Sequence, residues 1–224
     1  MISVILPVYN EAMLIEETLQ HLAQQEGGHE VIVVDGGSHD RSVDLARPYA
    51  RVLSSPKGRA LQMNAGARAA QGEILLFLHA DSWMERGAFL TIENVMQNKE
   101  VVGGCLTQRI EGAHPFYRFL EWSGTVRAKW LKLFYGDQAL FIRRRIFDKL
   151  GGYPLLPLFE DLAFSRHLRQ EGKTVVLPKR VFTSARRWKE KGILRGSLRN
   201  MILFFLYGIG VSPERLSKFY ADVR

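Results

Sequence analysis

The chain has 224 residues, of which 46% are hydrophobic and 24% are charged, and its formal net charge is +8. This composition excludes a disordered or fibrous protein, and the length fits one globular domain with a sizeable core and room for a short appendage. A single cysteine, Cys105, excludes an internal disulfide and favours a reducing compartment.

The chain starts with MISVILPVYNE, which reads as a strand and lacks the basic start and cleavage site of a signal peptide. No apolar run reaches the roughly 18 residues that a membrane span needs. We therefore expect a cytoplasmic protein. The basic charge favours an anionic partner, such as a phosphorylated substrate or an anionic lipid. Because no nucleic-acid-binding motif accompanies that charge, we expect no nucleic-acid partner.

The first half of the chain alternates apolar runs with helical patterns. Its expected strands are 2–9, 30–35, 51–54 and 73–79. The first expected helix follows Asn10, which would cap it, and two more are expected at about 42–49 and at 58–72. Apolar strands that alternate with helices predict a parallel α/β sheet.

The second half is less regular. Its expected strands are 101–109, 137–142 and 174–177, and its expected helices are 116–130, 161–171 and a tail after Lys189. The predicted fold class is therefore α/β, with a helical tail at the carboxyl end.

Polar side chains follow three of the expected strands. Glu11 comes after the first strand, Asp35 ends the second, and His79 and Asp81 end the fourth. In an open α/β sheet, ligands bind beyond the carboxyl ends of the strands, so these groups are expected in one crevice. Strand-end carboxylates in a basic protein suit Mg²⁺ or Mn²⁺ that carries a phosphate ester.

Each acid also has a purely structural interpretation. Asp35 before two glycines can form a turn, and Asp81 can cap a helix. Glu160 and Asp161 can be favourable charges at a helix N-terminus. The functional interpretation depends on all of these groups converging.

Four motifs in order resemble glycosyltransferase family 2, whose members have the GT-A fold. They are PVYNE, VVDGGSHD, NAGARAAQGEILLFLHAD and GGYPLLPLFEDLAFSRHLRQEG. The stretches GRALQMNAGA, FLHADS, GDQ and TSARRW are most similar to a bacterial subgroup associated with radical-SAM and selenodomain proteins. The resemblance implies a Rossmann-like, mostly parallel sheet flanked by helices.

The resemblance covers about residues 1–190 and implies a GT-A domain over that range. Its nucleotide-binding half would span about 1–110 and its acceptor half about 111–190. The remaining residues, 191–224, would be a helical tail that is interfacial or oligomeric.

The resemblance also implies roles for matching positions. Asp161 would be the general base beside Glu160, and Asp81 would be the surviving acid of the metal-binding D-x-D motif. The other implied residues are Pro7, Tyr9, Glu11, Asp35, Arg59, Asn64 and His79 for the nucleotide-sugar, and Asp137, Gln138, Arg186, Arg187 and Trp188 for the acceptor and diphosphate.

Two departures from the family pattern matter. His79 replaces the first acid of D-x-D, which affects metal binding. Ser184 replaces the glutamine of the Q-x-x-R-W motif of processive synthases, which argues against polymer synthesis.

The predicted function is an inverting, metal-assisted glycosyltransferase that uses Mn²⁺ or Mg²⁺. A UDP-sugar is favoured over a GDP-sugar, and the acceptor is an unidentified hydroxyl compound, with a lipid-linked one as an option. Two alternatives stay open: a sugar nucleotidyltransferase, and a non-catalytic membrane-docking protein that retains the fold.

The tail from 193 to 220 has an apolar centre flanked by Arg195, Arg199, Arg215 and Lys218. This pattern is typical of a helix that lies in an anionic interface, here the inner face of the membrane. The alternative is a helix that packs on the catalytic domain or on a second subunit in a homodimer.

Overall fold

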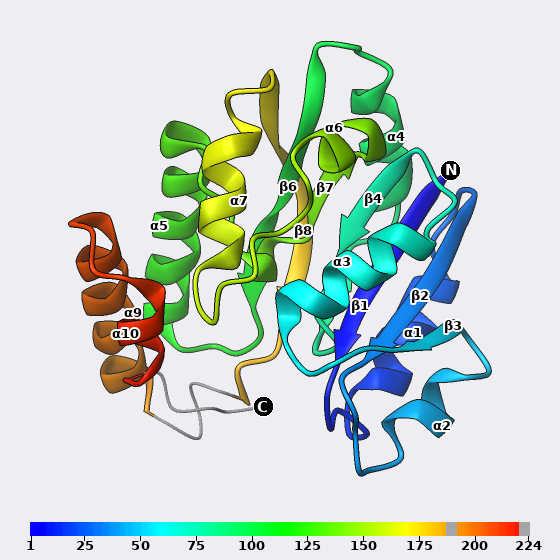
Figure 1. The fold of residues 1–224 in the computed structure, drawn as a ribbon, viewed down its shortest axis with the longest axis horizontal. Coiled ribbons are helices and arrows are strands. Elements are labelled where there is room, and N and C mark those ends of the chain that lie inside the picture. Colours follow the sequence, from blue (N-terminus) through cyan, green and yellow to red (C-terminus); the bar gives the residue numbers. More distant parts are fainter. Residues whose placement is uncertain (187–191, 220–224) are drawn as a thin grey trace.

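The computed structural model describes residues 1–186 and 192–219. At its centre is a mixed eight-stranded sheet in the order β3-β2-β1-β4-β7-β6-β8-β5. Figure 1 shows helices against both faces of this sheet. The strands are β1 (Ile2–Val8), β2 (His29–Asp35), β3 (Arg51–Ser54), β4 (Ile74–Phe77), β5 (Ser82–Met84), β6 (Val101–Ile110), β7 (Leu140–Arg143) and β8 (Lys173–Thr183).

The four strands of the amino-terminal half are parallel, as predicted. β1 pairs with β2 and β4, and β2 pairs with β3. All seven residues of β1 are buried, because helices cover both sides of this strand. Parallel strands end at the same edge, so Val8 and Asp35 lie opposite each other where β1 and β2 end.

The carboxyl-terminal half makes the sheet mixed. β7 runs antiparallel to both β4 and β6, and β8 runs parallel to β6. The short strand β5, which the sequence did not predict, pairs antiparallel with the end of β8. This pairing brings residues near 183 beside residues near 82.

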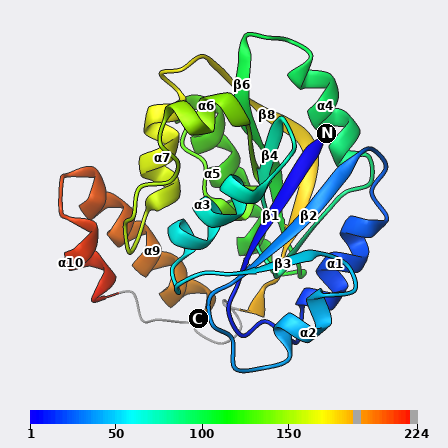
Figure 2. The same cartoon turned by 45° about the vertical axis from the view of Figure 1, so that its right-hand side comes forward.

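Two hydrophobic layers enclose the sheet. The first lies under α1 (Ile15–Ala23), α2 (Ser42–Ala46) and α4 (Ala88–Met96). The second lies under α3 (Arg59–Ala69), α5 (Pro115–Leu131), α6 (Arg144–Lys149) and α7 (Glu160–Leu168). Figure 2 shows α3 on the same side of the sheet as α5, α6 and α7. A Cβ on Gly66 would lie 2.5 Å from Ile5, so this glycine permits the close packing of α3 on β1.

Several local predictions were wrong. Asn10 does not cap α1: it adopts a φ of 54°, and its side chain instead accepts a hydrogen bond from the backbone N–H of His39. The helix begins at Ile15, after Leu14 as its N-cap residue. The sequence interpretation also missed α4, α6 and the short 3₁₀ helix η1 (Gly136–Gln138).

The described part of the tail is helical, as expected, and forms α9 (Ile193–Gly208) and α10 (Pro213–Ser217). Figure 1 shows these two helices at the edge of the molecule that also carries α5. Within residues 1–186 and 192–219, no helix has both the length and the apolar character that crossing a bilayer requires.

Candidate active site

Residues that follow β8 form hydrogen bonds with residues that follow β1 and β4. Arg186 donates from Nη2 to Oε2 of Glu11 at 2.9 Å, and only 2% of Glu11 is exposed. The backbone N–H of Ser184 donates to the carbonyl oxygen of Asp81 at 3.1 Å. The structure thus brings Glu11, Asp81 and Arg186 to one region, although 175 positions separate Arg186 from Glu11.

The carboxylate of Asp35 is held by its own turn. It accepts hydrogen bonds from the backbone N–H groups of Gly37 at 3.0 Å and Ser38 at 3.1 Å. Beside this turn, Nζ of Lys57 lies 4.0 Å from the centroid of the Tyr9 ring. A fixed carboxylate, an aromatic face and a cation therefore lie at the ends of β1 and β2, where a nucleotide can be recognised.

Gln62 is a buried residue that the sequence interpretation missed. Its Nε2 donates to the carbonyl oxygens of Val8 and Val34, each at 2.8 Å, and so ties α3 to β1 and β2 at their ends. A Cβ on Gly36 would lie 3.1 Å from this amide, so glycine leaves space for it. The available signal was a long amide side chain within the small-residue run GRALQMNAGA.

Glu160 and Asp161 begin α7 and have different partners. Glu160 is 2% exposed and forms an ion pair with Nε of Arg59 at 3.0 Å. Asp161 accepts hydrogen bonds at Oδ2 from the backbone N–H of Gly136 and at Oδ1 from that of Leu162, each at 2.7 Å. Burial, followed by the charge of Glu160, raises the pKa of Asp161 to about 7.

Gly136 joins Asp161 to His79. A Cβ on Gly136 would lie 2.7 Å from Nε2 of His79 and 3.7 Å from Oδ2 of Asp161. The two side chains therefore approach the same backbone atom, His79 from the end of β4 and Asp161 from α7. A substitution at Gly136 would require the buried imidazole of His79 to move.

Gln138 and Asp137 of η1, both predicted to contact the acceptor or the diphosphate, differ in how accessible they are. Gln138 is fully buried, and its Oε1 accepts hydrogen bonds from Nη2 of Arg127 at 2.9 Å and from the backbone N–H of Tyr135 at 3.1 Å. Direct contact of Gln138 with a substrate would require this turn to open. Asp137 is partly exposed and accepts from Nε2 of Gln108 at 2.7 Å, and Gln108 is a further residue that the sequence interpretation missed.

Four predicted residues have less direct support. Asn64 exchanges two hydrogen bonds with the backbone of Tyr153, at 2.9 and 2.8 Å, so its amide holds the loop before α7. Pro7 is buried within β1, opposite Val34. Contacts of Asn64 and Pro7 with a nucleotide remain predictions. The other residues, Arg187 and Trp188, lie outside the described part of the chain.

The described residues do not form a complete metal cage. Nowhere among them do three His, Cys, Asp or Glu side chains gather as a metal-ligand cluster. Asp81 is partly exposed, and its Oδ1 accepts a hydrogen bond from Oγ of Ser82 at 3.3 Å. A single carboxylate fits Mg²⁺ or Mn²⁺ whose other ligands are water and substrate phosphates.

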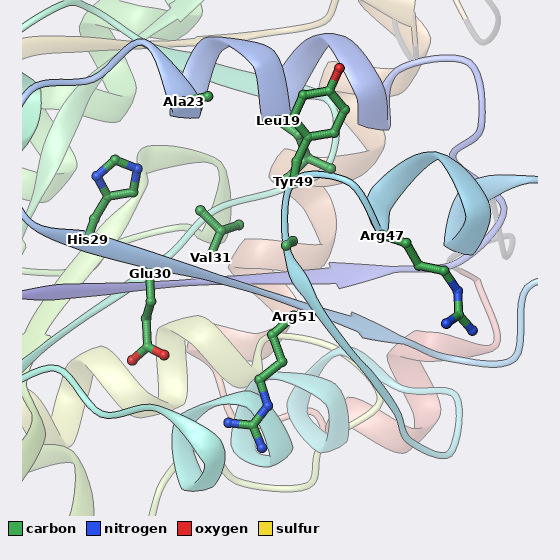
Figure 3. A pocket seen from close by; sticks show the side chains of 9 residues that line it. Leu19, Ala23, His29, Glu30, Val31, Arg47, Tyr49 and Arg51 are labelled. Atoms are coloured by element: carbon green, nitrogen blue, oxygen red, sulfur yellow. The ribbon is translucent and has the colours of Figure 1, made fainter.

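A hollow of ≈ 430 Å³ lies at the other end of the sheet, near the starts of β2 and β3. Figure 3 shows Leu19 and Tyr49 on one side of these strands, whereas Glu30 and Arg51 extend to the other side. Glu30 accepts a hydrogen bond from Ser3, and Arg51 donates to the carbonyl oxygen of Ala69. Glu30 and Arg51 are therefore engaged away from the hollow, which is distinct from the region of Asp81 and Asp161.

Two solved structures share the architecture. A mannosyltransferase from Pyrobaculum calidifontis, in complex with GDP-Man and Mn²⁺, has a TM-score of 0.66 at 23% identity and covers 81% of this chain and 56% of that one. TarS of S. aureus, in complex with UDP-GlcNAc, has a TM-score of 0.66 at 18% identity over 82% of this chain and 58% of that one. These matches confirm the predicted GT-A-type fold.

Curated proteins show similarity in sequence. The probable glycosyltransferase YdaM of Bacillus subtilis is 26% identical over an alignment of 218 residues that covers 85% of this chain and 50% of that protein. The PGL/p-HBAD biosynthesis glycosyltransferase of Mycobacterium tuberculosis is 31% identical over an alignment of 170 residues that covers 69% of this chain and 64% of that protein. The chain spans about a third to a half of the length of YdaM and two other curated relatives, AglE and EpsJ.

The predicted family is tested most directly by the family's own sequence profile. Residues 3–156 match the profile described as glycosyl transferase family 2. That range covers more than half of the 224 residues and contains the ends of β1, β2 and β4. This protein therefore belongs to glycosyltransferase family 2.

Proposed function

We propose that this chain transfers a sugar from a nucleoside diphosphate to an acceptor hydroxyl with inversion at the anomeric carbon, with Asp161 as the general base. The observation that carries the proposal is the environment of Asp161. Two backbone N–H groups orient its carboxylate, and burial raises its pKa to about 7. A base whose pKa lies near the working pH is suited to take a proton from a hydroxyl.

The rest of the reaction follows from this position. Each oxygen of Asp161 accepts one backbone hydrogen bond and retains a lone pair that an acceptor hydroxyl can approach. As that hydroxyl attacks the anomeric carbon, its proton passes to Asp161 and the nucleoside diphosphate departs with the bonding electrons. No covalent intermediate with the protein is required.

The donor side lies at the ends of β1, β2 and β4. The fixed carboxylate of Asp35 is suited to accept hydrogen bonds from the base, and the Tyr9 ring offers an apolar face. Asp81 would hold Mn²⁺ or Mg²⁺ together with the diphosphate. Such an ion, when bound, stabilises negative charge on the leaving group. The nucleotide-sugars in the two structurally similar enzymes, and the Mn²⁺ in the mannosyltransferase, support this arrangement.

Arg186 and Arg59 are candidates to assist the leaving group. Each forms an ion pair with a buried acid, Arg186 with Glu11 and Arg59 with Glu160. These pairs hold two guanidinium groups beside the proposed site before a substrate arrives. A diphosphate can accept bidentate hydrogen bonds from such groups.

Several finer features belong to the same proposal. They are a UDP-sugar in preference to a GDP-sugar, membership of the radical-SAM and selenodomain-associated subgroup, a catalytic domain at 1–190 with a tail at 191–224, and a lipid-linked acceptor reached from the inner face of the membrane. The motifs TSARRW and FLHADS support the subgroup. The basic charge of the chain supports an anionic acceptor.

The test is a binding and turnover panel with UDP, GDP, CMP and their sugars, each with Mn²⁺ and with EDTA. We expect tightest binding of a nucleoside diphosphate in Mn²⁺, and slow release of that diphosphate from its sugar in the absence of acceptor. Release of pyrophosphate from a nucleoside triphosphate and a sugar phosphate would instead identify a nucleotidyltransferase. No binding and no turnover with any donor would favour a non-catalytic protein.

A further inference from the structure

Helix α9 has two apolar faces, and only one of them is used by the fold. Leu203 on the inner face is buried with Leu158 and Leu216, and Tyr207 packs against this cluster. Tyr207 also stacks on Phe159 with ring centroids 4.8 Å apart. This inner face therefore attaches the tail to the catalytic domain.

The attachment occurs next to the proposed base. Phe159 directly precedes Glu160 and Asp161, and Tyr135, whose ring contacts Phe204 of α9, directly precedes Gly136. Gly136 donates the hydrogen bond to Asp161. The inner face of α9 thus supports both segments that position Asp161, so removing the tail would damage the site.

The outer face of α9 is apolar and exposed. It consists of residues at helical spacing on the side opposite Leu203, together with the C-cap residue Ile209, each between 48% and 65% exposed: Leu198, Met201, Ile202, Phe205 and Ile209. A row of five large apolar side chains in water is costly unless another surface covers it.

A second exposed apolar row lies on the neighbouring helix. Phe119, Trp122 and Trp130 on α5 are between 54% and 81% exposed and lie on the side of α5 away from the sheet. The start of α9 packs beside α5, because Ile193 lies against the cluster of Tyr117 and Leu120. Figure 1 shows the two helices along the same edge of the molecule.

Positive charge is concentrated in these two segments. Residues 115–133 and 193–219 together contain eight basic and two acidic side chains, so most of the net charge of +8 lies in them. Arg215 lies in α10 and Lys218 directly follows this helix, and both side chains are exposed. Exposed apolar and aromatic side chains surrounded by basic groups are typical of helices that lie in an anionic lipid interface.

We propose that the outer face of α9 docks on an anionic lipid surface, with α9 lying in the interface and the row of Phe119, Trp122 and Trp130 beside it. A second copy of this chain is a poorer occupant, because it would place two positively charged regions against each other. Anionic headgroups instead neutralise that charge while the acyl chains take up the apolar side chains. The docking surface does not depend on the proposed reaction.

The test is co-sedimentation of the full chain with vesicles of equal parts phosphatidylcholine and phosphatidylglycerol, and with vesicles of phosphatidylcholine alone. We expect binding to the anionic vesicles that weakens as salt is raised. The double variant Phe205→Gln, Ile209→Gln should bind at least about 10-fold more weakly, because two apolar side chains lose their burial. Replacing Arg215 and Lys218 by Gln should weaken binding by about fivefold per charge.

The control is Leu90→Gln, which changes a 41% exposed leucine on α4, on the other side of the molecule. It should bind vesicles like the unchanged chain. All variants should keep the same unfolding midpoint and donor turnover, since neither the inner face of α9 nor the site is altered. The donor-free binding assay thus separates failure of docking from failure of the proposed reaction.

Two results would overturn the proposal. One is the absence of binding to anionic vesicles at low and physiological salt, or an equal loss of binding in Leu90→Gln and the double variant. The other is a concentration-dependent dimer, seen by analytical ultracentrifugation, that the double variant abolishes while vesicles are ignored. That second result would assign the outer face of α9 to a homodimer.

Discussion

Two aspartates at the proposed site are held in opposite ways. Asp35 accepts its hydrogen bonds from residues two and three positions further along the chain, so a local turn sets its position. Asp161 accepts one of its hydrogen bonds from Gly136, which is 25 positions away, and it lies beside the buried Glu160. The first carboxylate depends on a short stretch of chain, whereas the second depends on tertiary packing.

This difference matches two different tasks. A carboxylate that must recognise a donor needs a fixed direction, which a turn with two N–H donors supplies. A carboxylate that must take up and release a proton needs a pKa near the working pH, and burial beside a second acid provides it. Substitutions at the two aspartates should therefore have different effects: some should alter turnover alone, some donor binding alone, and some pH dependence alone.

The largest effect is expected for Asp161→Asn. The amide keeps the shape but accepts no proton, so transfer should fall by about 10²–10⁴-fold, the usual worth of general-base catalysis. The dissociation constant of the donor should barely change. Steady-state kinetics and donor titration measure the two quantities. Glu160→Gln is the matched control, and an inactive Glu160→Gln beside an active Asp161→Asn would show that the base is misassigned.

Asp81→Ala comes next. Because Asp81 is the proposed protein ligand of the divalent ion, the variant should lose the tightening of nucleotide binding by Mn²⁺, by about 10²-fold. Calorimetric titration with Mn²⁺ and with EDTA measures this loss. Asp44→Ala, an exposed aspartate in α2, is the control. Equal affinities in Mn²⁺ and EDTA for the unchanged chain would contradict a metal-assisted site.

A smaller effect is expected for Asp35→Asn. The variant keeps one acceptor oxygen but loses the charge, so donor binding should weaken by about 10-fold, the worth of one hydrogen bond to a charged group. Turnover at saturating donor should stay within about threefold of the unchanged chain, since Asp35 has no part in proton transfer. Unchanged binding with lost turnover would contradict the division between the two aspartates.

The smallest effect is a shift in pH dependence. Since the charge of Glu160 is one cause of the raised pKa of Asp161, Glu160→Gln should lower that pKa and move the acidic limb of kcat/KM below pH 7. Glu171→Gln, just beyond the carboxyl end of α7, should leave the pH profile unchanged. If the pH dependence of kcat/KM is unchanged in Glu160→Gln, then Glu160 does not influence the pKa of the general base.

The same pKa shift has a consequence for stability. The folded state holds the proton of Asp161 more tightly than the unfolded chain, whose pKa is near 3.8. Its contribution to the free energy of unfolding is therefore present at low pH and lost as the pH rises from about 4 to about 7. Asp161→Asn should remove this part of the pH dependence.

The sequence predicted the amino-terminal half of the fold well for a physical reason. Strands β1, β2 and β4 are buried on both faces, so their residues form apolar runs that stand out from the helices. β5 has three residues, too few to show a period. α6 is a single six-residue helix that directly follows β7, so no loop marks its start.

The site was predicted in part. The order of Glu11, Asp35 and Asp81 after apolar strands predicted that they gather at one edge, because parallel strands end together. The ion pairs of Arg59 with Glu160 and of Arg186 with Glu11 join residues about a hundred or more positions apart, and local patterns carry no such information. For the same reason the buried position of Gln138 could not be anticipated from the motif GDQ.

The contacts at the end of β8 also set an order of assembly. Strands β1, β2, β3 and β4 lie within the first 77 residues and can pair as the chain emerges. The carbonyl group of Asp81, however, accepts its hydrogen bond from Ser184, and Glu11 pairs with Arg186. Both partners are synthesised only near the end of the chain. Closing contacts of this sequence separation is slow, so strands β1, β2, β3 and β4 should pair well before the crevice is complete.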